Sequence, residues 1–210
     1  MTNLPRQPPL SMLRSYTPAD GLTIANAACG TICIFLSLDY MAFGDRWRLW
    51  LAIWLLPVAL LCDVLDGYVA RLRRSRPSLL GADLDSLADV ISFGLGPAVL
   101  GYTLGLRGGW DMVCLTYFVI CGVSRLARFN ATAAQLTDDA TGKVKYFEGT
   151  PIPTSIAIVL LLAAALWTGR VQDALWLGSV RIAGLALHPL ALVYAISGSA
   201  MISTIRIPKP

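Results

Sequence analysis

Acidic residues are few in this chain, yet five of the 13 lie between positions 63 and 89. Residues three or four apart lie on one face of an α-helix, so Asp63 would lie beside Asp66. Asp85 would likewise lie beside Asp89, whereas Asp83 should point away. Four carboxylates can then converge where two helices meet, and they repel one another unless cations lie among them. Because Mg²⁺, Mn²⁺ and Ca²⁺ prefer oxygen ligands, the pattern predicts a metal site.

The spacing of these residues resembles the signature of the CDP-alcohol phosphotransferase family, D-x-x-D-G-x-x-A-R followed by G-x-x-x-D-x-x-x-D. The fixed positions that match are Asp63, Asp66, Gly67, Ala70, Arg71, Gly81, Asp85 and Asp89. The alternative is a set of salt-bridged aspartates on two soluble helices. It is disfavoured because an aspartate within apolar helices is costly and usually functional.

The resemblance implies an enzyme that moves a substituted phosphate group from a CDP-linked donor to an alcohol. It also implies a homodimer and a divalent metal, Mg²⁺ or Mn²⁺, with two ions in each active site. The metal ligands that it implies are Asp63, Asp66, Asp85 and Asp89. Asp89 is in addition the implied general base. The implied donor-binding residues are Asp66, Gly67, Ala70, Arg71 and Gly81.

The composition is typical of an integral membrane protein. Of the 210 residues, 56% are hydrophobic and only 14% are charged, with a mean hydropathy of +0.63; globular chains carry about 25% charged residues. The net charge of +4 is too modest to indicate nucleic acid and suits basic loops beside an anionic leaflet. The five cysteines lie in apolar stretches without a C-x-x-C pair, so they predict neither a disulfide framework nor a zinc site.

Apolar runs divide the chain into six expected spans, so the expected fold is all-α, a six-transmembrane-helix bundle. The spans are 21–43, 47–71, 79–106, 110–129, 152–168 and one within 182–204. A cytoplasmic segment, 1–20, would precede the six-span domain, 21–204, and a cytoplasmic tail, 205–210, would follow it. The first segment lacks the apolar core of a signal peptide and would carry a short juxtamembrane helix at 11–16. Asp20 is the expected cap of the first span.

The distribution of basic residues predicts the orientation. With the N-terminus inside, the inner loops and tails hold 12 Lys and Arg residues and the outer loops hold five. Five of the tryptophans, Trp47, Trp50, Trp110, Trp167 and Trp176, then fall near the outer interface, as an aromatic belt would. Both termini and the acidic motif are therefore expected on the cytoplasmic side of the cell membrane.

Three further stretches bear on the acceptor. They are Ser92-Phe-Gly-Leu-Gly-Pro97, Ser124-Arg-Leu-Ala-Arg-Phe-Asn130 and Gly149-Thr-Pro-Ile-Pro153. Together they resemble the membrane-embedded branch of the family that transfers a phosphatidyl group from CDP-diacylglycerol to L-serine. In the last stretch Gly-Thr-Pro stands where Gly-Leu-Pro is expected. Arg125, Arg128 and Asn130 are the candidate partners of the serine carboxylate, and positive-inside anchoring is the alternative reading of the two arginines.

Other functions stay open at this point. The same chemistry is possible with glycerol 3-phosphate or inositol phosphate as acceptor, or with an archaeol-type donor. A cation transporter is a further alternative, since aspartates within a membrane also line cation paths. The only histidine, His188, has no assigned role. It also leaves no pair of histidines for a phosphohistidine mechanism, which favours direct in-line transfer.

Overall fold

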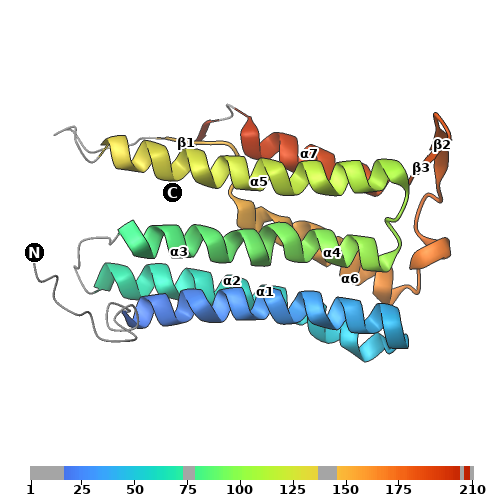
Figure 1. The fold of residues 1–210 in the computed structure, drawn as a ribbon, viewed down its shortest axis with the longest axis horizontal. Coiled ribbons are helices and arrows are strands. Elements are labelled where there is room, and N and C mark those ends of the chain that lie inside the picture. The colour runs from blue at the N-terminus through green and yellow to red at the C-terminus, as the bar shows by residue number, and fades with distance from the viewer. Residues whose placement is uncertain (1–16, 73–78, 137–145, 204–205, 209–210) are drawn as a thin grey trace, which may run out of the picture.

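Long helices with roughly parallel or antiparallel axes make up this protein (Figure 1). The computed structural model describes residues 17–72, 79–136, 146–203 and 206–208. Its helical elements are α1 (Pro18–Phe43), α2 (Arg46–Leu72), α3 (Leu79–Asp89), the π-helical segment η2 (Val90–Leu95), α4 (Gly96–Leu104), α5 (Gly109–Leu136), the 3-10 helices η3 (Ile152–Ser155) and η4 (Gln172–Ala174), α6 (Ile156–Trp167) and α7 (Ala191–Ile202).

Four helical stretches are long and apolar enough to cross a membrane. They are Pro18–Phe43, Arg46–Val69, Gly81–Leu104 and Gly109–Ala131. At 1.5 Å per residue, even the shortest is longer than the hydrocarbon core of a bilayer, about 30 Å. Large apolar side chains such as Phe35, Trp54 and Ile120 are exposed on them, as contact with lipid requires. Two shorter apolar helical stretches, Ile152–Trp167 and Ala191–Ile202, lie within the last two expected spans.

The helices form two groups, which meet where α5 of one group contacts α3, η2 and α4 of the other. Figure 1 shows α1, α2 and the continuous rod of α3, η2 and α4 side by side, while α5 and α7 pack together on the other side. The obliquely running α6 contacts both α2 and α4. The end of α2, the start of α3 and the end of α5 lie at one end of the bundle, on the left in Figure 1. We name it the aspartate end.

The first helix begins differently from the sequence expectation. Thr17, not Asp20, is the N-cap of α1, and its hydroxyl accepts a hydrogen bond from the Asp20 N–H. Asp20 in turn accepts one from the Thr17 N–H at 2.6 Å, which completes a capping box. Pro18 then occupies the first helical position, where its missing N–H costs nothing. The spacing of Thr17 and Asp20 was the signal for this cap.

The third span changes its helical pitch directly after Asp89. In η2 the helix widens, and the Gly96 N–H reaches back five residues to the Ile91 carbonyl. Pro97 gives a physical reason, because proline has no N–H to donate and its ring crowds the carbonyl four residues earlier. A π-helical turn accommodates such a residue without breaking the span.

The first helix packs closely against this π-helical turn. A Cβ atom on Gly30 would lie 2.5 Å from Ser92 Oγ and 2.7 Å from Ser92 Cα, so only glycine permits the contact. The Ser92 hydroxyl donates to the Asn26 carbonyl at 2.8 Å, four residues before Gly30. Ser92 and Asn26 are both fully buried. The position of α1 along the third span is therefore fixed.

Aromatic packing joins α7 to both helix groups. The rings of Phe118 and Tyr194 meet edge to face, with centroids 5.3 Å apart. The Tyr194 hydroxyl donates to the Pro97 carbonyl at 2.7 Å. Gly101 makes room for that ring, because a Cβ there would lie 2.4 Å from the hydroxyl oxygen. One buried tyrosine thus connects α4, α5 and α7.

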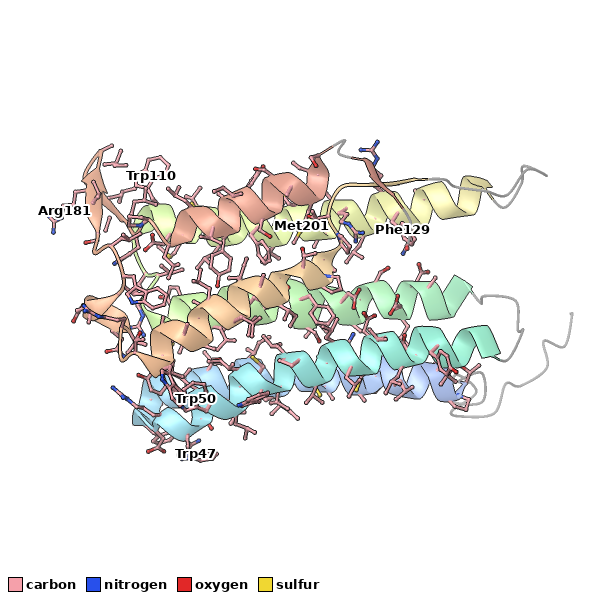
Figure 2. All side chains as sticks on the ribbon, turned by 180° about the vertical axis from the view of Figure 1, so that it is seen from behind. Trp47, Trp50, Trp110, Phe129, Arg181 and Met201 are labelled. Atoms are coloured by element: carbon pink, nitrogen blue, oxygen red, sulfur yellow. The ribbon has the colours of Figure 1, made fainter. Side chains whose placement is uncertain are left out.

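The opposite end of the bundle carries a β-hairpin, β2 (Val180–Ile182) with β3 (Leu185–Leu187). Ala183 and Gly184 form its turn, and both have the positive φ that a tight hairpin turn needs. Trp47, Trp50, Trp110 and Arg181 lie at this end in Figure 2, and Phe129 lies toward the aspartate end. The three tryptophans lie at the same end of the bundle, as expected of one interfacial belt.

A buried carboxylate holds this hairpin end together. Asp111 is fully buried, accepts from the His188 N–H at 2.7 Å and lies 2.6 Å from His188 Nδ1. The Gly108 N–H also donates to Asp111 at 2.7 Å, which caps the start of α5. The indole of Trp110 donates to the Ile182 carbonyl of the hairpin. His188 therefore has a structural role remote from the acidic motif.

Several expected boundaries change. The helix expected to end at 129 continues as α5 to Leu136, so Asn130 is helical and not in a loop. The stretch 182–204 begins with the hairpin and is helical only from Ala191, because the Ala-Gly turn reverses the chain. Strands β1 (Tyr146–Glu148) and β4 (Arg206–Pro208) pair antiparallel, so the fold is mostly helical and not purely α. The expected helix at 11–16 lies outside the described residues.

Candidate active site

Three carboxylates meet at the aspartate end. Asp63 and Asp66 come from one face of α2, near its end, and Asp85 comes from α3. Each offers an oxygen, and the three oxygens lie within 4.8 Å of one another. We name these three residues the carboxylate trio. Asp83 is exposed and is not one of the three, as its register on α3 predicts.

Asp89 lies one helical turn beyond the trio, at the last position of α3. It is only 6% exposed. Its charge interacts most strongly with that of Asp63 and less strongly with that of Asp85. The Asn26 side chain donates from Nδ2 to Asp89 Oδ1 at 3.2 Å. Asp89 therefore interacts electrostatically with the trio, and its hydrogen bond comes from α1.

The sequence reasoning missed the part that α1 plays. Thr23 Oγ1 donates to Asp66 Oδ2 at 2.7 Å, and Asn26 bonds Asp89 as described above. The buried residues of α1 recur every three or four positions: Asp20, Thr23, Asn26, Gly30, Cys33, Ser37 and Tyr40. Polar and small residues at helical spacing in an apolar span mark the face that packs against other helices. That periodicity was the available signal.

The predicted donor-binding residues follow the trio along the chain. Gly67 is half-buried on α2, directly after Asp66, and Gly81 is half-buried near the start of α3. Ala70 and Arg71 belong to the last turn of α2. All of them lie at the aspartate end, where the two helices that carry the trio approach the connection between them.

The three predicted acceptor residues separate into different environments on α5. Arg125 is half-buried, its charge interacts with that of Asp89, and its Nε is buried without a hydrogen-bond partner among the described residues. Arg128 is exposed. Asn130 donates to Ser86 Oγ at 3.0 Å and to Asp83 at 3.4 Å, so it ties α5 to α3. The interaction of its charge with Asp89 places Arg125 near the acidic motif.

The trio fits a divalent cation. Asp85 Oδ1 is buried, and no residue in the described part of the chain donates a hydrogen bond to it. Among the side chains that the structure describes, which do not include that of Arg71, no Lys, Arg or His forms an ion pair with a member of the trio. Three uncompensated carboxylates at this spacing repel one another, and oxygen ligands of this kind suit a hard cation.

Comparison with known proteins agrees with this geometry. The family model described as CDP-alcohol phosphatidyltransferase matches residues 16–197. The chain belongs to this family. The match includes the four long helices, the trio and Asp89, and the family uses divalent metals. Together with the apolar helices, membership makes the chain a multi-pass membrane protein.

The relatives include proteins from a yeast, a bacterium and an archaeon. The chain is 43% identical over 203 residues to the CDP-diacylglycerol–serine O-phosphatidyltransferase of Saccharomyces cerevisiae. The aligned region covers 95% of this chain and 73% of the yeast protein. It is 38% identical over 133 residues to the protein of that name from Helicobacter pylori strain 26695, and the aligned region covers 61% of this chain and 52% of that protein. It is 36% identical over 143 residues to the archaetidylserine synthase of Methanothermobacter thermautotrophicus, covering 67% and 54%. The matches thus span from about half to about three quarters of these relatives. No solved structure matches the chain.

Removal of one trio carboxylate should prevent metal binding. Asp63→Asn, Asp66→Asn and Asp85→Asn each keep the size of the side chain but remove a charged ligand. We expect Mn²⁺ affinity, measured by calorimetry, to fall by more than the roughly 10–100-fold typical of residues that only support a ligand. Asp83→Asn is the matched control on α3 and should bind as the unmodified protein does. An equal loss in Asp83→Asn would mean that the α3 register is wrong.

Proposed function

We propose that this protein transfers the phosphatidyl group of CDP-diacylglycerol to the hydroxyl of L-serine, giving phosphatidylserine and CMP. The observation that carries the proposal is the buried Asp89 one turn beyond the carboxylate trio, with Arg125 of α5 within electrostatic reach. The names of the yeast and Helicobacter relatives support serine as the acceptor. The exchange is a direct displacement at phosphorus.

The proposed reaction forms one bond and breaks one. The serine Oγ attacks the phosphorus that carries the diacylglycerol. The bond between this phosphorus and the oxygen that bridges to CMP breaks, and its electron pair leaves with CMP. Asp89 accepts the proton of the hydroxyl, as a general base must, since a neutral hydroxyl is a poor nucleophile. Burial of Asp89 keeps competing water away from that proton acceptor.

The trio and Asp89 hold the metal in this proposal. Asp63, Asp66 and Asp85 are the main ligands, and Asp89 lies close enough to contribute. When bound, two Mg²⁺ or Mn²⁺ ions neutralise charge on the pyrophosphate and on the leaving group. The donor nucleotide then lies along Asp66, Gly67, Ala70, Arg71 and Gly81, where two glycines leave the backbone open to close approach.

Arg125 is the proposed partner of the serine carboxylate. Its buried Nε lacks a described partner, and a buried N–H without an acceptor is costly unless a ligand completes it. Arg128 and Asn130, nearer the end of α5, are proposed to assist at the entrance. Glycerol 3-phosphate and inositol phosphate carry a phosphate of their own. They would require a stronger basic cluster than Arg125, Arg128, Lys143 and Lys145 provide.

A donor with archaeol in place of diacylglycerol is the second candidate, since one relative is an archaetidylserine synthase. It shares the headgroup chemistry and differs only in the lipid chains. A cation transporter has less support. No acidic residue occurs in α2 before Cys62 or in η2 and α4 after Asp89, so the carboxylates do not continue across the membrane.

The proposal includes six spans with both termini in the cytoplasm and a homodimeric assembly. The two shorter apolar stretches, Ile152–Trp167 and Ala191–Ile202, supply the fifth and sixth spans. Arg46, Arg107 and Arg181 are then outside, at the hairpin end. The excess of basic residues in the loops of the aspartate end supports the orientation.

An acceptor screen tests the proposed function. Purified protein with Mn²⁺ and CDP-diacylglycerol is given L-serine, glycerol 3-phosphate, inositol phosphate or no acceptor, and CMP release is measured. We expect serine to give the highest kcat/KM. A higher value with a phosphorylated acceptor would refute serine as the substrate, and no CMP release with any acceptor would refute the enzyme class. Replacing the donor by CDP-archaeol decides between the two candidate donors.

Arg125→Ala should raise the KM for serine more than the KM for CDP-diacylglycerol. We expect a rise of about 10–100-fold, the size that the loss of a charge-assisted hydrogen bond of about 1.5–3 kcal/mol gives. Arg128→Ala, on the same helix, should have the smaller effect because Arg128 is exposed. Equal changes in both KM values for Arg125→Ala would assign it to the donor or to the fold.

The orientation is testable with single cysteines in a cysteine-free background. One is placed at position 107, at the hairpin end, and one at position 74, which lies outside the described residues but follows α2. A membrane-impermeant maleimide should label position 107 only from outside intact cells and position 74 only after the cells are opened. Labelling of both from the same side would contradict the proposed topology.

A further inference from the structure

Asn26 is an amide in the middle of an apolar membrane helix, and it is fully buried. A buried amide is costly unless its donors and acceptor are paired. In Asn26 the amide is only partly paired. Its Nδ2 donates to Asp89 Oδ1, whereas its Oδ1 has no partner among the described residues. The unpaired Oδ1 is a cost to the fold, and the Nδ2 donor is used on the carboxylate of Asp89.

Two contacts of Asn26 enclose the turn that carries Asp89. Its side chain holds the Asp89 carboxylate at 3.2 Å, and its main-chain carbonyl holds the Ser92 hydroxyl at 2.8 Å. Ser92 is three residues after Asp89, inside the π-helical segment that begins at Val90. Asn26 therefore contacts the third span at two points, at Asp89 just before the π-helical segment and at Ser92 within it.

The backbone that presents Asn26 cannot move easily. Gly30 lies one turn later on the same face and packs against Ser92 so closely that no Cβ would fit. A carboxylate held at one oxygen by a fixed donor has its other oxygen in a defined direction. For a general base that direction decides whether a proton can be transferred, because the acceptor hydroxyl must lie within hydrogen-bond reach.

The chemistry of the amide suits this purpose. Asn26 donates a hydrogen bond without bringing a positive charge, so it orients Asp89 without neutralising it. A lysine or arginine at this position would pair with the carboxylate and would also repel a divalent cation at the trio. Thr23 makes the equivalent neutral contact with Asp66 one turn earlier.

We propose that Asn26 is a positioning residue, which aims the Asp89 carboxylate at the acceptor hydroxyl through the Nδ2–Oδ1 hydrogen bond. The inference rests on the proposed function, in which Asp89 is the general base. It adds a residue outside the acidic motif, from a different helix. Its consequence is that Asn26 affects turnover through Asp89 and does not affect donor binding.

A double-mutant cycle tests the inference. CMP release is measured on the full chain for the unmodified protein, Asn26→Ala, Asp89→Asn and the double variant, with the acceptor that supports the fastest turnover. Asn26→Ala should lower kcat by about 10–100-fold, as supporting residues do, and leave the KM for CDP-diacylglycerol unchanged. Asp89→Asn should lose about 10²–10⁴-fold. The double variant should be no slower than Asp89→Asn, since Asn26 then has no base to position.

Asn26→Asp is the second variant, because it keeps the size but replaces the donor with a carboxylate that repels Asp89. We expect it to be at least as slow as Asn26→Ala, because it removes the hydrogen bond to Asp89 and adds a like charge beside it. Ser37→Ala is the control. Ser37 is equally buried on α1 but bonds only its own helix, to the Cys33 carbonyl, so its removal should leave kcat unchanged.

Three results would overturn the inference: full activity in Asn26→Asp, a loss in the double variant equal to the product of the two single losses, or a raised KM for the donor with unchanged kcat in Asn26→Ala. A higher kcat/KM of the unmodified protein with an acceptor other than serine would refute only serine as the substrate, and the cycle would be interpreted in the same way. No CMP release from the unmodified protein with any acceptor would overturn the proposed function and this inference together.

Discussion

Repulsion among buried carboxylates is the constraint on which this structure depends. Asp63, Asp66, Asp85 and Asp89 lie near one another at the end of an apolar bundle, and no described basic residue forms an ion pair with them. Like charges in a poorly solvated site oppose one another, so this arrangement costs the fold free energy. A divalent cation held among the carboxylates would offset that cost.

The rest of the aspartate end keeps these side chains in place. Short-range contacts from α1 hold Asp66 and Asp89 by neutral donors, and Gly30 brings α1 close enough to make those contacts. Rigid support of this kind matters for catalysis, because a carboxylate must already point at its proton or its metal when the substrate arrives. The π-helical turn after Asp89 packs against the same part of α1, through the contacts of Ser92 with Asn26 and Gly30.

The two ends of the bundle have different tasks. At the hairpin end, a buried aspartate and the only histidine join α5 to the chain that leads into α7, and tryptophans gather there (Figure 2). No acidic residue connects this end to the trio through α2 or α4. The carboxylates of the acidic motif therefore lie toward one end of the bundle, and the contacts of Asp111 stabilise the other.

The sequence by itself determined the features that depend on local order. Helical periodicity places Asp63 beside Asp66, and long apolar runs mark the four long helices, because both properties follow from residues near one another in the chain. The family signature could likewise be identified from the sequence alone, because it is a matter of residue types and spacing. Even the exclusion of Asp83 followed from its register on α3.

Only the tertiary structure decided which helix supports which carboxylate. Asn26 and Asp89 are 63 positions apart in the chain, and no local pattern states that they meet. The same holds for Arg125, which is half-buried and interacts electrostatically with Asp89, while Arg128 is exposed. Spacing within one helix fixes which residues share a face, but the rotation and depth of each helix against its neighbours come from packing of the whole bundle, as at Gly30 and Ser92.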